Sequence, residues 1–376
     1  MKRLFATFAA LALAGVSCSQ ALASPVTDCP MREAPFSITS PLVDILLNPA
    51  AKTAVETQAP HILQALPPAL LLTTAPTFAA ILSLKDLGRM AGMDPATLDK
   101  ADKALRAIAV TKIDRVARCA RYDNDRPTFI LPRGKPHILL FEKITGFRDG
   151  PSVDAARAAF RASARKNGWS MVVTDKGGAM TPKILQQFDI VIWNNVSGDV
   201  LTLAQRQAFK SYIEHGGGFL GVHGSAGDPT SFWDWYVDTL IGARFAGHPM
   251  NPQFQDAKII IADGKQPIVT GLPKSWTLND EWYSFQNNPR AGGASVIATL
   301  DESSYSPQGA GQGNLRMGDH PIVWTRCVGK GRAFYSAIGH RPEIYSDVNY
   351  LRLLENAIRW TASRGTACGR PATSAR

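Results

Sequence analysis

The chain has 376 residues, of which 45% are hydrophobic and 19% charged, so it is long enough to bury a large core and to carry a smaller domain. The formal charge of +10 comes from scattered basic residues, with one stripe at Arg157, Arg161 and Arg165. The solvated face of a helix explains this stripe better than nucleic-acid binding does, so we expect no nucleic-acid partner.

The first 23 residues have the pattern of a secretory signal peptide. Lys2 and Arg3 precede an apolar run over 4–16, and an Ala-Leu-Ala cleavage site follows at 21–23. The apolar run is too short to span a membrane. We therefore predict a signal peptide over 1–23, no membrane span, and a mature protein that is exported to the periplasm or secreted.

Removal of the signal peptide would leave four cysteines, an even number that favours two disulfides in an exported protein. Three pairings are possible. We favour Cys29 with Cys119 and Cys327 with Cys368, because each bond would then join the ends of one region. The alternative is that some of them stay as buried thiols, and their spacing matches no zinc or redox motif.

Residues 24–130 are expected to form a small helical region and a linker. Asp94 is a helix N-cap followed by proline, which begins a helix over 96–108, and a second helix is expected over 111–120. Prolines and a glycine in 125–135 indicate the linker.

Strands then alternate with helices. Apolar strands joined by helices are typical of a parallel sheet covered on both faces, which predicts a doubly wound α/β domain over 135–364. Short strands between turns in its second half predict added antiparallel strands, and a tail follows at 365–376. The expected strands are 137–141, 169–174, 189–194, 218–222, 258–262, 276–278, 282–285, 295–299, 322–327 and 332–338, and the expected helices are 152–167, 181–187, 202–215 and 347–362.

The strand at 218–222 is the centre of the sequence-based site. Thr202 and Gln205 fit a capping box for the helix before it, and Gly216 fits the left-handed residue at that helix's end. The strand ends in His223 among small residues, and ligands bind at the carboxyl ends of strands in open parallel sheets. A structural histidine near a turn would give the same pattern, so both interpretations of His223 stay open.

Further histidines also lie beside turns in the second half. His248, His320 and His340 each precede a proline by one or two residues, and a structural hydrogen bond is the favoured role for His320. Histidines with carboxylates can transfer protons or bind a divalent metal such as zinc, although no diagnostic ligand spacing occurs. The candidate catalytic residues are His223, His340 and Glu281, and the candidate metal ligands are His223, His248 and His340.

Aromatic residues gather in the same half of the chain. Flat rings stack on the C–H faces of sugars, so rings beside carboxylates suit a carbohydrate pocket, whereas core packing is the simpler role for any one ring. The aromatic residues are Trp233, Trp235, Tyr236, Trp282, Tyr283 and Phe285.

The segment 137–364 resembles the ThuA-like family, named for trehalose utilisation. The matching runs are 143–148, 216–223, 242–249, 280–283, 320–324 and 329–340. The resemblance implies a flavodoxin-like fold of the class I glutamine amidotransferase-like superfamily. The chain departs from the family at Asp149, because a histidine usually follows the Gly-Phe-Arg motif there.

The same resemblance bears on glutamine hydrolysis. In true amidotransferases a nucleophilic cysteine stands where this chain has His223, and their His-Pro-Glu run is similar to 340–343. An imidazole cannot form the glutamyl thioester, so we do not expect amidotransferase activity.

Three hypotheses about function follow. The resemblance implies an enzyme acting on a sugar or keto-sugar, in which a base removes a hydrogen α to a ketone. The alternatives are a non-catalytic carbohydrate-binding or accessory module and a metal-dependent hydrolase of another substrate. The expected partner is a small carbohydrate, and the candidate substrate-binding residues are Arg148, Asp149, His248, Asp280, Trp282, Tyr283 and Glu343.

Overall fold

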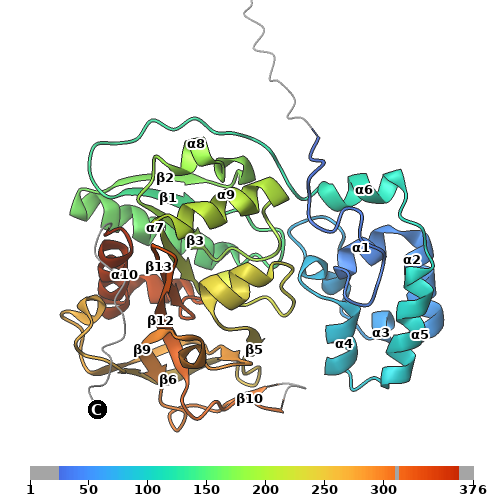
Figure 1. Ribbon diagram of the computed structural model, residues 1–376. Coiled ribbons are helices and arrows are strands. Elements are labelled where there is room, and N and C mark those ends of the chain that lie inside the picture. The colour runs from blue at the N-terminus through green and yellow to red at the C-terminus, as the bar shows by residue number, and fades with distance from the viewer. Residues whose placement is uncertain (1–24, 310–312, 364–376) are drawn as a thin grey trace, which may run out of the picture.

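The computed structural model describes residues 25–309 and 313–363 (Figure 1). A helical region, blue to cyan in Figure 1, lies beside a larger α/β domain that holds the rest of the chain. The predicted signal peptide over 1–23 and the tail at 365–376, with Cys368, lie outside the described residues. Within the described residues, no helix combines the length and apolar character needed to cross a membrane.

The helical region packs around its own core, which includes Phe36, Leu42 and Leu105. The expected disulfide between Cys29 and Cys119 is present and joins the start of the region to its last helix. Its helices are α1 (Leu42–Leu47), α2 (Pro49–Gln58), α3 (Pro60–Gln64), α4 (Leu84–Met90), α5 (Pro95–Arg106) and α6 (Lys112–Cys119). The last two are the helices that the sequence predicts.

The α/β domain is built on one nine-stranded sheet in the order β2-β1-β3-β4-β13-β12-β9-β6-β7. The first five strands are parallel, in the order typical of flavodoxin-like folds. They are β2 (Ser170–Thr174), β1 (His137–Phe141), β3 (Ile190–Asn194), β4 (Gly218–Val222) and β13 (Gly331–Ser336). Every residue of β3, β4 and β13 is buried, as expected for strands with both faces covered.

The second half of the sheet is antiparallel. Its strands are β12 (Pro321–Val328), β9 (Ser295–Leu300), β6 (Phe254–Ile261) and β7 (Ser275–Glu281). The predicted strand over 282–285 is reduced to β8 (Ser284–Phe285), which pairs with β5 (Phe245–Gly247) in a separate small sheet. The hairpin of β10 (Gln308–Gly309) and β11 (Gly313–Asn314) is the third sheet of the described chain.

Four α-helices and a π-helix pack on the large sheet. They are α7 (Gly150–Asn167), α8 (Pro182–Leu185), α9 (Leu203–Glu214), α10 (Val348–Thr361) and the π-helix Trp235–Ile241. The capping box of Thr202 and Gln205 opens α9, and Gly216 adopts a φ of +110° between α9 and β4, as the sequence predicts. The strand order places β4 between β3 and β13, so its end, and therefore His223, lies in the inner part of the sheet.

Candidate active site

His223 is the first residue after β4 and begins the short 3-10 turn His223–Ala226. Its φ of +37° is a left-handed conformation that side chains other than glycine rarely adopt, and such strain concentrates at functional sites. The imidazole is 3% exposed. Its Nδ1 donates a hydrogen bond of 2.7 Å to the carbonyl of Ala337, so the neutral ring carries its lone pair on Nε2.

Glu281, the last residue of β7, lies directly opposite that lone pair. Its Oε2 is 3.3 Å from Nε2 of His223 and 3.0 Å from Nδ1 of His340. Its Oε1 is 3.2 Å from Nδ1 of His248 and accepts a hydrogen bond from the amide of Gln253. Burial would raise the pKa of Glu281, but hydrogen bonds from His223 and His340 in their protonated forms outweigh it and hold that pKa well below its usual value.

His340 completes the cluster from the segment that follows β13. Its Nδ1 is 3.1 Å from Nε2 of His223, and its Nε2 is 3.5 Å from a carboxylate oxygen of Asp149. Burial lowers the pKa of His340, whereas the hydrogen bond to Glu281 raises it, and the net shift is upward. Both nitrogens of this ring therefore face carboxylates.

Asp280 holds the backbone that carries His340. Its side chain is fully buried and accepts N–H groups from Gly339 at 2.6 Å, His340 at 3.1 Å and Arg341 at 3.0 Å. Burial raises the pKa of this carboxyl group despite the three hydrogen bonds. The chain after β13 is therefore attached to the end of β7, which brings His340 to Glu281.

The geometry of this cluster fits a tetrahedral metal ion. His223, Glu281 and His340 form a group of possible ligands whose ligand atoms all lie within 4.8 Å of one another. Ligand atoms about 2.1 Å from a tetrahedral zinc ion would be about 3.4 Å apart, close to the three separations observed here. Each ring also has its second nitrogen near an oxygen acceptor, Ala337 for His223 and Asp149 for His340, as is usual for metal-binding histidines.

The model of the Trehalose utilisation (ThuA) family matches residues 137–361, which is more than half of the chain. This chain belongs to the ThuA family. The match covers the whole nine-stranded sheet and every residue of the cluster, whereas the helical region lies outside it.

The chain is also similar to proteins of solved structure. A putative ThuA-like protein from Bacteroides uniformis has 26% identity and a TM-score of 0.53, over 63% of this chain and 95% of that one. A second, from Parabacteroides merdae, has 18% identity and a TM-score of 0.45, over 64% of this chain and 94% of that one. No curated protein matches the chain.

Five of the predicted site residues of this ThuA-family chain come together in one cluster, namely Asp149, His223, His248, Glu281 and His340. Tyr283 is buried and stacks on His223 with ring centroids 4.1 Å apart. His320 has the structural role expected of it, because it is fully buried between Glu302 and the carbonyl of Tyr283.

Other predicted ligand contacts lie differently. Trp282 is fully buried and donates its indole N–H to Gln255, so its ring is a core residue. Asp280 is likewise occupied by backbone groups, which leaves no oxygen for a ligand to reach. Arg148 is exposed, and Glu343 is an exposed residue that pairs with Arg341.

The sequence reasoning did not select the exposed rings that flank His340. Phe147 is 39% exposed with its ring centroid 6.2 Å from that of His340, and Phe254 is 38% exposed at 5.1 Å. Phe147 lies inside the Gly-Phe-Arg motif, so the motif could have identified it as a candidate site residue. Phe254 begins β6 after a proline-rich turn, and nothing local in the sequence marks it.

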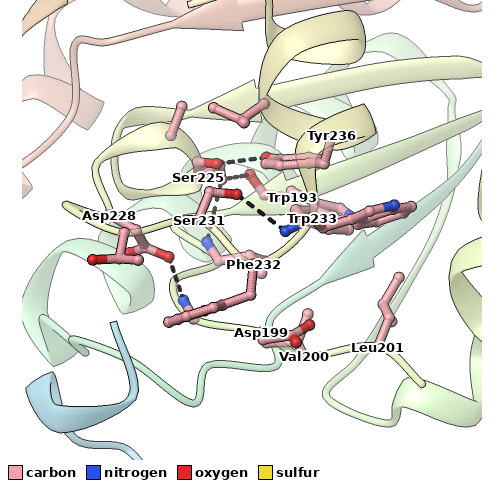
Figure 2. A pocket seen from close by; sticks show the side chains of 15 residues that line it. Trp193, Asp199, Val200, Leu201, Ser225, Asp228, Ser231, Phe232, Trp233 and Tyr236 are labelled. Carbon is pink, nitrogen blue, oxygen red and sulfur yellow. Dashed lines mark hydrogen bonds between the residues drawn. The ribbon is translucent and has the colours of Figure 1, made fainter. Parts of the chain in front are cut away.

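A small cavity is lined in part by Ser225, within the turn that begins at His223 (Figure 2). It is small, about 50 Å³, and its lining includes Trp193, Ser225, Asp228 and Tyr236. None of the clustered histidines lines it. It has room for only one or two waters. We place the candidate active site at the His223, Glu281 and His340 cluster because the possible ligand atoms of these residues converge there.

Proposed function

We propose that this protein is an exported enzyme that binds a divalent metal ion and acts on a sugar or keto-sugar. The observation that carries the proposal is the convergence of His223, Glu281 and His340, whose ligand atoms lie 3.0 to 3.3 Å apart. The Cys29–Cys119 disulfide is compatible with export.

The cluster requires a positive charge at its centre. Because Ala337 fixes the neutral tautomer of His223, its lone pair points at a buried carboxylate and at a second imidazole nitrogen. Facing acceptors in a buried site are unfavourable unless a proton or a metal ion lies between them. A single divalent ion would satisfy all three groups and leave one coordination position for a substrate oxygen.

The remaining residues supply the rest of the chemistry. When bound, the ion would polarise a ketone or hydroxyl oxygen of the sugar. His248 contacts Glu281 with Nδ1 and is partly exposed, which suits it to move a proton between the substrate and solvent. Asp149 would hold the second nitrogen of His340 and stand in for the histidine common in the family.

The substrate class rests on the family and on the exposed rings. The matching family is described by trehalose utilisation, and Phe147 and Phe254 offer two flat apolar faces beside His340. Such faces stack on the C–H surface of a sugar ring. Glutamine hydrolysis is not part of the proposal, because it needs a thiolate where this chain has His223.

Metal content is the first test. We expect about one equivalent of zinc or another divalent ion per purified wild-type chain by inductively coupled plasma mass spectrometry. Glu281→Gln keeps the shape of the side chain but removes its charge, so it and His223→Ala should lose the ion. His215→Ala, at an exposed histidine, is the matched control and should keep it. Wild-type protein that stays metal-free after incubation with zinc, cobalt or manganese would exclude the metal site.

Turnover is the second test. Metal-loaded protein would be incubated with trehalose, its mono-keto form and a panel of keto-monosaccharides, and products followed by mass spectrometry. Product formation that Glu281→Gln abolishes supports an enzyme. Tight sugar binding without any product would instead support the carbohydrate-binding module. If Glu281→Gln and His223→Ala keep both sugar binding and turnover, the assignment of these residues to the site is refuted.

A further inference from the structure

The helical region, which lies outside the family match, contacts a short loop of the α/β domain beside the candidate active site. This loop, residues 143–149, follows β1, and we call it the Phe147 loop. The backbone N–H of Thr77 donates a hydrogen bond of 3.0 Å to the carbonyl of Thr145. The ring of Phe78 stacks on that of Phe147, with centroids 4.7 Å apart and an angle of 27° between the planes.

Gly146 of the Phe147 loop has no free space around it. A Cβ atom on Gly146 would lie 2.5 Å from Cγ2 of Ile81 in the helical region and 2.4 Å from Oγ of Ser197 in the α/β domain. Real Cβ contacts are almost never this short. The loop is therefore packed between two parts of the protein that are far apart in sequence.

The α/β domain fixes the other side of the loop. Ser197 accepts the backbone N–H of Phe147 at 3.0 Å and donates its hydroxyl to Asp228 at 2.6 Å. Asp228 also accepts the N–H of Gly198, and Figure 2 shows its carboxylate in this position. The backbone of Phe147 is thus held from the domain side, whereas its ring is held by Phe78.

Further contacts keep the helical region against the domain. The hydroxyl of Tyr122 donates to Asp199 at 2.7 Å, and the carbonyl of Ile81 accepts the N–H of Thr230 at 3.2 Å. Lys143 pairs with Asp123 at 2.6 Å where the helical region ends. The position of the helical region relative to the sheet is therefore set by more than the Phe78–Phe147 pair.

We propose that the helical region forms one wall of the active site and that Phe78 is a positioning residue for Phe147. Phe78 covers one face of the Phe147 ring and thereby directs the exposed part of that ring toward His340. The inference rests on the proposed function for its substrate class, a molecule with a sugar ring that stacks on Phe147. The proposal therefore gives the helical region, which precedes the family match over 137–361, a part in recognising the sugar ring.

The first test does not depend on the substrate. Hydrogen–deuterium exchange of a peptide covering 143–149 would be compared in wild type, Phe78→Ala and Phe78→Tyr. We expect several-fold faster exchange in Phe78→Ala and wild-type exchange in Phe78→Tyr, which keeps the ring. Leu72→Ala removes an exposed apolar side chain from the same region and is the matched control. Unchanged exchange in Phe78→Ala would overturn the inference.

The second test measures recognition. Calorimetric titration of the metal-loaded proteins with trehalose and with its mono-keto form should show about 3- to 10-fold weaker binding for Phe78→Ala, since aromatic pairs couple at this level. Phe147→Ala should bind more weakly still, and adding Phe78→Ala to it should have no further effect. Additive losses in the double variant, or unchanged affinity in Phe78→Ala, would overturn the role in recognition.

The two proposals fail in different ways. Metal content and the pH dependence of turnover should be the same in Phe78→Ala as in wild type, because Phe78 contacts neither a ligand atom nor the reacting groups. If the wild-type protein binds neither sugar, the proposed substrate class is refuted, and the exchange experiment alone then decides whether Phe78 positions Phe147. A metal loss in Phe78→Ala equal to that in Glu281→Gln would refute a role confined to Phe147.

Discussion

Replacing Asp280 with asparagine would test the link between the sheet edge and the catalytic cluster. The carboxylate accepts N–H groups from Gly339 at Oδ2 and from His340 and Arg341 at Oδ1. Asparagine has one side-chain oxygen, so its amide group must face at least one of these donors. The less costly orientation keeps the oxygen on His340 and Arg341 and loses the 2.6 Å bond from Gly339.

The size of the effect follows from that single loss. A hydrogen bond to a charged group contributes about 1.5 to 3 kcal/mol, and the neutral amide regains part of the cost of burying a charge. We therefore expect Asp280→Asn to lower the free energy of unfolding by about 2 kcal/mol. Because the affected backbone carries His340, metal affinity should fall roughly 10- to 100-fold, as for other residues that orient metal ligands.

Urea unfolding and a zinc competition titration with a chromophoric chelator would measure the two effects. Asp256→Asn is the matched control, because it removes the same charge from an exposed position on β6, the neighbouring strand. It should change both quantities little. An Asp280→Asn protein with wild-type stability and wild-type zinc affinity would show that the three hydrogen bonds do not hold the cluster together.

Three further predictions concern the surroundings of the site. Replacing Cys29 and Cys119 with serine opens a disulfide with a sequence separation of 90, and should lower the stability of the helical region by about 4 kcal/mol in urea unfolding; an unchanged midpoint would contradict this. Gly146→Ala forces a Cβ atom against Ile81, so we expect a loss of about 1 to 3 kcal/mol in thermal unfolding, and no loss would show that the loop can move aside. Burial raises the pKa of Asp228 to about 7, so the folded protein keeps a proton that the unfolded chain releases near pH 4. The bound proton stabilises the folded state at low pH, and this stabilisation is lost as the pH rises from about 4 to about 7. Asp228→Asn should therefore show a shallower decline of urea midpoint over that range, and identical slopes would refute the shifted pKa.

Local patterns predicted most of the fold. The strands at 137–141 and 218–222 have the observed bounds, and the helix before β4 begins at its capping box, because caps, glycines and apolar runs act over a few residues. The prediction of a strand over 282–285 was wrong at its start. Trp282 and Tyr283 form a buried connection between β7 and β8, and such a connection has the same apolar composition as a buried strand. The short helices α1 to α4 have weak hydrophobic periodicity, so the sequence predicts a helical region there but not the bounds of each helix.

The candidate site was predicted as a set of residues but not as a geometry. His223 could be placed because a strand end in a parallel sheet has a known environment. The sequence assigned Glu281 a catalytic role and Asp280 a substrate-binding role, whereas in the structure Asp280 binds backbone and Glu281 faces the histidines. Adjacent residues at a strand end point to opposite sides, and the sequence alone does not say which side holds the site.

The meeting of Glu281 with His223 depends on the shape of the whole sheet. Four strand-to-strand steps separate β13 from β7, which in a flat sheet would be about 19 Å. Yet the carboxylate of Asp280 lies within hydrogen-bond distance of the segment that follows β13. The segment after β13 and the twist of the sheet together close this distance, and the two register shifts between β9 and β12 provide local bends that increase the twist. The antiparallel half thus has a direct role, because it returns the edge strand to the centre and supplies the carboxylate that the parallel half lacks at His223.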